Sequence, residues 1–285
     1  MQRRSTVTRV LVVSDTHLSS RTPEAVDNWS AVVRYAAGRK PALVVHTGDI
    51  TADGADRDDD LELARDELGR LGAPTRVVPG NHDIGETPGL RSPEVVVSPA
   101  RLARYRGAIG LDRWRVDVPG WRLLGVNGLL LGSGMADEGD QWRWLDDEVA
   151  GLDELAQPTL LALFLHKPLR PTPVVPDDAT PTRYVPPAAR DRLLDLLGGV
   201  PGSLVVSGHC HQFSSEVHDG LTSVWAPSTW AVIPDRVQPC LGAKVCGVVE
   251  LRLAADGDLR IQLIQPAGMR QHTLGETVAH PDVGP

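Results

Sequence analysis

Residues 77–85 read VVPGNHDIG, an apolar run that ends in a Pro-Gly pair and is followed at once by Asn81, His82 and Asp83. Glycine tolerates positive φ, and Asn and Asp side chains bond their own backbone, so a turn accounts for most of these residues. A turn does not require His82. Whether this stretch is an ordinary turn or part of a functional site therefore depends on the rest of the chain.

The composition is that of an ordinary globular protein. The 285 residues are 41% hydrophobic and 23% charged, with a formal net charge of −8. Such a chain can bury a core, and its apolar content excludes a disordered protein. The acidic balance argues against polymeric nucleic acid as a partner, since phosphate binding uses clustered Lys and Arg. A small anionic substrate stays compatible, because a metal ion can supply positive charge locally.

Cysteine usage and the N-terminal segment indicate the compartment. The three cysteines, Cys210, Cys240 and Cys246, are sparse and odd in number, so they imply no disulfide framework. The N-terminal stretch is basic, but its apolar run is short and no small-residue cleavage motif follows. No apolar run reaches membrane-spanning length. We therefore expect a cytoplasmic protein without a membrane partner; the sequence does not indicate an oligomeric state.

Apolar patterning predicts an alternation of strands and helices. Helical spacing predicts helices at 24–37, 61–71, 99–109, 139–150 and 187–197. The first third therefore alternates strand and helix, which predicts a parallel sheet, and the strand-rich latter part predicts a second, more antiparallel sheet. The strands are expected at 9–15, 42–49, 75–81, 121–127, 159–166, 203–209, 221–228, 244–253 and 259–267.

No linker divides the chain, so we expect one domain over residues 1–270 and a weakly ordered tail over 271–285. Residues 168–187 are a long proline-rich connection. Connections of this length are usually functional or mobile, and we expect this one to cover a pocket and influence substrate choice.

Polar side chains follow five of the predicted strands. The loops at the carboxyl ends of strands in an open α/β sheet share one edge and form the binding crevice, so these side chains should converge. A single histidine at a strand end is more often structural, whereas five such endings in one chain indicate a site. The residues concerned are Asp15 and His17, Asp49, Asn81 and His82, His166, and His209 with His211.

The donor types predict a metal centre. Carboxylate, imidazole and amide groups without thiolate suit Mn, Fe or Zn better than a cysteine-rich structural zinc site would. The set is too large for one ion. Two ions ~3.5–4 Å apart that share a carboxylate would use all of these ligands, and such a pair clamps the attacking and leaving oxygens in phosphoryl transfer.

The order of these motifs resembles the calcineurin-like metallophosphoesterase family, over residues 9 to about 230. The resemblance implies an α/β fold, an αββα four-layer sandwich of two mixed β-sheets flanked by helices. It also implies a dinuclear metal-dependent phosphoesterase that uses in-line attack by a metal-bridging hydroxide. The motifs are DTH (15–17), GD (48–49), GNHD (80–83), the lone His166 and GHCH (208–211).

The same resemblance assigns roles by position in the motifs. His82 would not be a ligand; it would contact the phosphate and protonate or polarise the leaving oxygen. The expected ions are manganese, iron or both, with zinc compatible. One ion would be held by Asp15, His17 and His211 and the other by Asn81, His166 and His209, with Asp49 bridging the two.

Three further residues keep alternatives open. Asp53 either orients His82 or belongs to a surface turn. Asp83 either supports the ligands from behind or is a turn residue, and we favour the turn. Lys167 stands where the family's bacterial cyclic-nucleotide branch commonly has a second histidine; it either meets an anionic substrate or reaches solvent.

Other candidates are interpreted as structural. His46, inside an apolar strand, is expected in the core or behind the ligands, and Cys210 is expected to be a packed thiol. We expect His218, His272 and His280 on the surface. Trp225 and Trp230 follow GHCH closely; core packing is the default for both, although one of them could wall the pocket.

Among functions, the resemblance favours a phosphodiesterase acting on a small phosphate ester, with a 3′,5′-cyclic nucleotide as one candidate. A phosphomonoesterase of the same fold is the alternative, and a non-catalytic metal-binding scaffold is a more distant one. A protein Ser/Thr phosphatase fits less well, because that branch resembles RGNHE where this chain has Pro79 and Asp83. The physiological substrate and native metals are not indicated.

Overall fold

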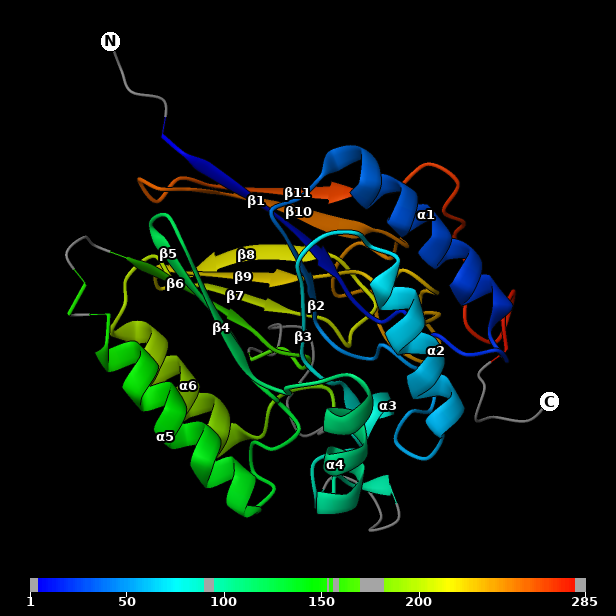
Figure 1. Cartoon of the computed structure of the whole chain (residues 1–285), viewed down its shortest axis with the longest axis horizontal. Coiled ribbons are helices and arrows are strands. Elements are labelled where there is room, and N and C mark those ends of the chain that lie inside the picture. Colours follow the sequence, from blue (N-terminus) through cyan, green and yellow to red (C-terminus); the bar gives the residue numbers. More distant parts are fainter. Residues whose placement is uncertain (1–4, 90–94, 153, 156–158, 170–181, 280–285) are drawn as a thin grey trace.

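The computed structural model describes residues 5–89, 95–152, 154–155, 159–169 and 182–279. Two β-sheets lie face to face, and helices cover their outer faces (Figure 1). The strand order is β11-β10-β1-β2-β3 in the first sheet and β4-β5-β6-β7-β9-β8 in the second. The predicted four-layer αββα sandwich of two mixed sheets is therefore confirmed.

The elements follow one another with bounds close to those predicted, and all five expected helices are present. Among the residues that the structure describes, no helix has both the length and the apolar character that crossing a membrane would require. The elements are β1 (Val7–Val13), α1 (Pro23–Arg39), β2 (Leu43–His46), α2 (Asp58–Gly69), β3 (Thr75–Val77), α3 (Asn81–Ile84), α4 (Pro99–Ala108), β4 (Trp114–Val118), β5 (Trp121–Gly125), α5 (Ala136–Ala150), β6 (Leu160–Phe164), α6 (Pro187–Gly198), β7 (Leu204–Ser207), β8 (Ser214–His218), β9 (Leu221–Trp225), β10 (Val248–Ala254) and β11 (Leu259–Ile264).

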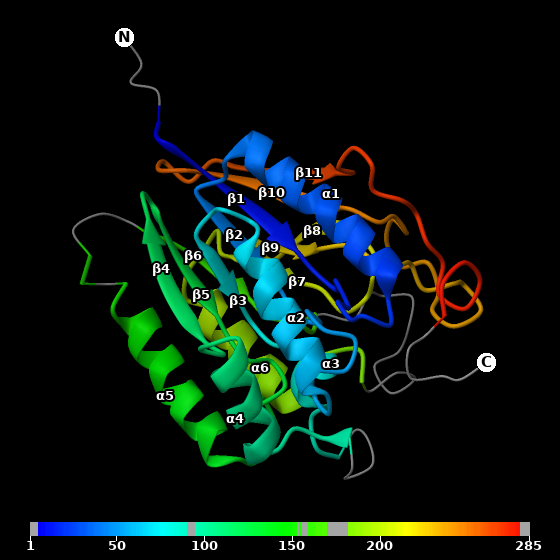
Figure 2. The ribbon, with the colours of Figure 1, turned by 45° about the vertical axis from the view of Figure 1, so that its right-hand side comes forward.

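The first sheet is built around three parallel strands, β1, β2 and β3, joined by helices α1 and α2. Because side chains alternate between the faces of a strand, β1 serves two cores. Leu11 packs outward with Trp29 of α1 and Leu61 of α2. Val10 and Val12 point inward, into the core between the sheets. Figure 2 shows α1 and α2 lying across the outer face of this sheet.

The second sheet corrects one prediction. Its central strands β5, β6, β7 and β9 are parallel, and only the edge strands β4 and β8 are antiparallel to their neighbours. The expectation of a more antiparallel second sheet is therefore wrong. The C-terminal strands β10 and β11 instead extend the first sheet in antiparallel register. The edge strands β4 and β8 were not predicted, because their half-exposed sequences contain no continuous apolar run.

The C-terminal segment has defined contacts as far as Val278. Val232 N donates to His272 O and Leu274 N donates to Val232 O, each at 2.9 Å. Val278 is buried with Trp230. This part of the expected tail thus packs on the body through its apolar side chains, and residues 280–285 lie outside the described residues. So do residues 170–181 of the proline-rich connection.

Close packing of the strand ends depends on two glycines. A Cβ placed on Gly80 would lie 2.1 Å from Asp49 Oδ1 and 2.3 Å from Asp49 N. A Cβ on Gly208 would lie 1.9 Å from Ser14 Oγ and 2.7 Å from Asp15 Oδ2. These separations are shorter than non-bonded atoms can adopt. The loops after β1, β2, β3 and β7 can therefore approach as they do because these positions have no side chain.

We predict that Gly80→Ala displaces the Asp49 carboxylate and lowers the bound metal per chain, measured by elemental analysis of the purified protein. Gly38→Ala is the matched control, because nothing lies within 4 Å of a Cβ at Gly38 near the end of α1. That control should keep its metal and gain up to ~1 kcal/mol of stability. Wild-type metal content in Gly80→Ala would show that the close approach is not required.

Candidate metal centre

The predicted ligands lie at the carboxyl ends of five parallel strands, three from the first sheet and two from the second. Backbone hydrogen bonds tie these ends together. Asp15 N donates to Gly48 O at 3.0 Å, and Gly208 N donates to His166 O at 2.8 Å. Between the sheets, His209 N donates to Asp15 Oδ1 at 3.1 Å. The convergence expected from the sequence is present.

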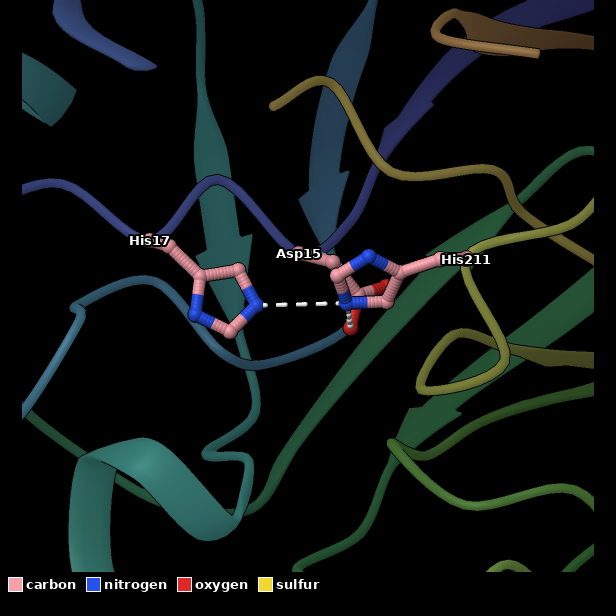
Figure 3. A group of neighbouring side chains, drawn as sticks. All are labelled: Asp15, His17 and His211. Atoms are coloured by element: carbon pink, nitrogen blue, oxygen red, sulfur yellow. Dashed lines mark hydrogen bonds and ion pairs between the residues drawn. The ribbon is translucent and has the colours of Figure 1, made fainter. Parts of the chain in front are cut away.

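One cluster joins Asp15, His17 and His211, and all three side chains are buried. Figure 3 shows Asp15 and His17, from the loop after β1, pointing toward His211, from the loop after β7. His17 Nε2 lies 3.3 Å from His211 Nε2, and His211 Nε2 lies 3.5 Å from Asp15 Oδ1. One ligand atom from each residue falls within 4.8 Å of the others, so a single ion could contact all three.

A second cluster surrounds His166. Its Nε2 atom lies 3.2 Å from Asp49 Oδ2, 3.2 Å from Asn81 Oδ1 and 3.1 Å from His209 Nδ1. These contacts come from loops after β2, β3, β6 and β7. The cluster therefore contains the predicted second ligand set and the carboxylate predicted to be shared.

Asp49 lies between the two clusters. Its Oδ2 atom is 3.2 Å from His166 Nε2 and 3.8 Å from His17 Nε2, so one oxygen faces a histidine of each set. His82 groups with His17 and Asp49 as a third combination of potential ligands. The geometry thus gives Asp49 the central position that a bridging carboxylate needs.

Three histidines of the centre are held from behind by backbone carbonyls. His166 Nδ1 donates to Thr47 O at 2.9 Å, and His211 Nδ1 donates to Ala231 O at 2.7 Å. His209 Nε2 donates to Thr182 O at 3.1 Å. A carbonyl only accepts, so the proton sits on the outer nitrogen and the inner nitrogen faces the cluster. Metal-bound histidines have this arrangement in most proteins, because it fixes the tautomer and the ring orientation.

The buried carboxylates require nearby positive charge. Asp15 and Asp49 are 0% and 2% exposed, and among the described residues their ion-pair partners are histidines. Burial, together with the Asp49 charge, raises the pKa of Asp15. Burial opposes ionisation of Asp49 as well, yet His166 and His82 hold its pKa well below the usual value. Divalent cations would supply the charge that this donor set lacks, so the residues fit a metal centre.

The need for positive charge beside Asp49 also affects the pKa of His166. Burial alone would lower its pKa, but the carboxylate of Asp49 raises it to about 9. A metal ion between these two side chains would replace that proton, since a ligating histidine must be neutral.

The ligand loops have an unusual backbone. Seven described residues other than glycine have a clearly positive φ, and five of them are predicted ligands. This left-handed conformation is uncommon for residues with a Cβ, and such conformations cluster at functional sites. The packing around the clusters therefore holds these residues in a conformation that local preference alone would not select. The five are Asp15, His17, Asp49, His209 and His211, with φ between 46° and 66°.

His82 lies beside the predicted ligands and is held by two hydrogen bonds. Its backbone N donates to Asp49 Oδ1 at 2.9 Å, and its ring Nδ1 donates to Ala52 O at 2.7 Å. The ring lies 4.7 Å from that of His17, centroid to centroid. The carbonyl of Ala52 therefore fixes the imidazole. Asp53 lines the pocket beside His82 and lies 3.9 Å from Arg21, and its predicted role in orienting His82 stays a prediction.

Asp83 corrects an interpretation from the sequence. It is 1% exposed, and it accepts hydrogen bonds from Gly80 N at 2.8 Å, Ile50 N at 3.2 Å and Thr51 N at 2.9 Å. The view of Asp83 as a turn residue alone is therefore wrong. Its carboxylate joins the loops after β2 and β3, which present Asp49 and Asn81. Burial and the charge of Asp49 raise the pKa of Asp83 to about 6.

Lys167 also differs from expectation. Its side chain is fully buried and forms an ion pair with Glu86, so the suggestion that it reaches solvent is wrong. Glu86 lines the pocket beside His82. The pair thus connects the end of β6, which carries His166, to the pocket wall.

The residues interpreted as structural are placed as expected where the structure describes them. His46 is buried and accepts from Gly48 N at 3.2 Å, and burial lowers its pKa to about 3. Cys210 is a buried thiol whose pKa burial raises to about 12. The His218 side chain is 51% exposed, His272 is partly exposed, and His280 lies outside the described residues.

Trp230 and two serines contribute to the centre. The Trp230 ring lies 4.9 Å from that of His17, so this tryptophan packs on the first cluster, whereas Trp225 belongs to a separate buried cluster. Ser228 Oγ donates to Asp15 O at 2.7 Å, and Ser14 Oγ donates to Asp15 Oδ2. Sequence reasoning missed both serines; the only local signal is their position beside the DTH motif and in the WAPST segment (225–229).

An open pocket of about 310 Å³ borders the centre. The predicted ligand Asn81 and the neighbouring His82 both line this pocket. Arg101, from α4, also lines it, and this residue was not identified from the sequence. The other polar side chains of the wall include Asp53, Asp56, Glu86, Thr182 and His209.

Curated relatives of this chain are named as phosphodiesterases. A probable cyclic nucleotide phosphodiesterase of Psychrobacter arcticus is 25% identical over 240 residues, which cover 77% of this chain and 79% of the relative. A probable glycerophosphodiester phosphodiesterase, GpdQ, of Arcobacter nitrofigilis is 27% identical over 231 residues, 77% of each chain.

Solved structures share the fold. A dimetal phosphatase from Danio rerio superimposes with a TM-score of 0.65 at 14% identity, covering 90% of this chain and 95% of that one. The purple acid phosphatase PPD1 from yellow lupin gives a TM-score of 0.63 at 13% identity, covering 95% of this chain and 54% of that one.

The model of the calcineurin-like phosphoesterase family matches residues 8–213, most of the chain. That match spans every predicted ligand, from Asp15 to His211. The fold, the order of the motifs and the phosphodiesterase-named relatives agree with it. The chain belongs to the calcineurin-like phosphoesterase family.

Proposed function

We propose that this chain is a dinuclear metal-dependent phosphodiesterase. Its family and its phosphodiesterase-named relatives support a phosphoester hydrolase. The observation that carries the dinuclear proposal is the position of Asp49, whose Oδ2 faces His166 on one side and His17 on the other.

In this proposal Asp15, His17 and His211 would hold one ion, Asn81, His166 and His209 would hold the other, and Asp49 would be shared between them. When bound, the ions supply positive charge to the phosphate oxygens and acidify water near neutral pH. The donor set suits manganese, iron or zinc. Asp83 and the carbonyls of Thr47 and Ala231 keep the ligands in place, because they fix the loops and the histidine tautomers.

His82 serves the leaving group. With Nδ1 donating to Ala52 O, the protonated ring can deliver its Nε2 proton to a leaving oxygen. The backbone bond to Asp49 fixes the distance between this acid and the shared carboxylate. A histidine positioned in this way can donate a proton to the leaving group and recover it in each cycle.

A diester is favoured over a monoester by the space beside His82. A phosphodiester carries a second ester group that needs room on the far side of phosphorus. The pocket of about 310 Å³ next to Asn81 and His82 offers that room. Both curated relatives are named for diester hydrolysis, which supports the same choice. A cyclic nucleotide is one candidate within this class.

We predict that His82→Ala keeps its metal and loses about 10²–10⁴-fold in turnover, the usual contribution of a positioned general acid. Turnover and metal content are measured on the same preparation. His218→Ala, on the exposed edge strand β8, is the control and should match the wild type in both. Metal content that falls in step with activity would instead make His82 a ligand.

We further predict that a chelator abolishes hydrolysis of bis(p-nitrophenyl) phosphate and that Mn²⁺ restores it. The restored enzyme should cleave this diester at least tenfold faster than p-nitrophenyl phosphate at equal concentration. A faster monoester reaction would identify a phosphomonoesterase. If neither ester is hydrolysed with Mn, Fe or Zn, the scaffold alternative is supported.

A further inference from the structure

A second hollow lies far from the metal centre, at the start of β1. It has a volume of about 890 Å³, and Val7, Arg9, Lys40, Arg252, Asp258 and Arg260 contribute to its wall. Figures 1 and 2 show the β10–β11 hairpin lying beside the beginning of β1. Arg9 precedes Asp15 by six residues along the strand, so the two sites are about 20 Å apart.

Three arginines form a row across this part of the first sheet. Arg9 of β1 is the direct cross-strand partner of Arg252 in β10, and Arg252 is the direct partner of Arg260 in β11. Like charges directly opposite each other on neighbouring strands are destabilising. The row therefore opposes folding unless something negative lies against it.

Part of that negative charge comes from a buried carboxylate. Glu250 is 1% exposed, and it lies two positions before Arg252 along β10, so both side chains face the same side of the sheet. Its carboxylate accepts from Arg252 Nε at 2.8 Å and from an Arg39 terminal nitrogen at 3.2 Å, and it lies 3.6 Å from Arg9 Nε. One carboxylate thus positions three guanidinium groups. Although burial opposes its ionisation, Arg252 and Arg39 hold the pKa of Glu250 below the usual value.

The side chains around this pocket carry a positive net charge. Among the described residues, five cations meet only two carboxylates here, which leaves an excess of three positive charges in a chain whose net charge is −8. Asp258, the second carboxylate, lies 3.5 Å from Arg260, whose side chain is 75% exposed. The cations are Arg9, Arg39, Lys40, Arg252 and Arg260.

The distance that the three arginines span indicates which type of anion fits them. Neighbouring strands lie about 4.8 Å apart, so three strands place the arginines along roughly 10 Å. Guanidinium groups bind phosphate oxygens in pairs with fixed geometry. A single phosphate would reach only neighbouring arginines, whereas adjoining phosphates can follow the whole row. The volume lies within the range of small-ligand pockets.

We propose that this pocket is a binding site for a small ligand with two or more adjoining phosphate groups. The site does not depend on the proposed function, because it shares no residue with the metal centre. Glu250 keeps the arginines in place, and the ligand neutralises the charge that Glu250 and Asp258 leave over.

Calorimetric titration of the metal-loaded protein with inorganic tripolyphosphate tests this proposal. Arg260→Gln should weaken binding by about tenfold or more, as loss of one charge-assisted contact does. This substitution keeps Arg9, Arg39 and Arg252, the three partners of Glu250, so we expect the variant to fold as the wild type does. Arg143→Gln, on α5 with a side chain 72% exposed, is the matched control and should bind as the wild type does. Orthophosphate should bind at least tenfold more weakly than tripolyphosphate.

Binding at the metal centre is measured separately, as inhibition of diester hydrolysis by tripolyphosphate. The inhibition constant should be the same for wild type and Arg260→Gln. Unchanged calorimetric affinity in Arg260→Gln, or an equal loss in Arg143→Gln, would overturn the proposal. So would duplex DNA that binds more tightly than tripolyphosphate and loses its affinity in Arg260→Gln.

Discussion

Two carboxylates buried among histidines are the constraint on which this structure depends. Asp15 and Asp49 are almost inaccessible to solvent, and the ion-pair partners that the structure gives them are imidazoles. Burying such charges is strongly unfavourable unless positive charge lies close by. Loops from both sheets place histidines beside the two carboxylates. Backbone carbonyls accept from the outer ring nitrogens of His166, His209 and His211, so the inner nitrogens face the site. The result is a buried set of donors whose charge cations would balance.

The backbone conformations of the site loops are locally unfavourable. Five of the predicted ligands occupy the left-handed backbone region, and Gly80 and Gly208 are held against neighbouring loops with no room for a side chain. Each left-handed residue costs on the order of 1 kcal/mol or more. The surrounding sheets supply that energy, because β2, β7 and the last four residues of β1, which lead into the loops of these five residues, are buried. The arginine row at the other end of β1 is a second place where like charges are kept together against local preference.

The sequence predicts the layers and the convergence of the site, but not every partner. Asp15, Asp49 and His166 follow continuous apolar runs, so the end of each strand is visible in the chain and the shared sheet edge brings them together. The pairing of strands is less visible, because an apolar run does not show which strand lies beside it. For this reason the sequence does not indicate that β10 and β11 belong to the first sheet. Asp83 and Lys167 were misjudged since their roles depend on Thr51 and Glu86, which contact them only in the fold. The left-handed backbone of the predicted ligands cannot be recognised from residue type alone.

An anomalous-diffraction map of the metal-loaded protein tests the central claim most directly. The account predicts two peaks about 3.5–4 Å apart on either side of the Asp49 carboxylate, one beside His17 and His211 and one beside His166 and His209. A single peak that uses only one of these sets, or peaks that do not contact Asp49, would contradict it.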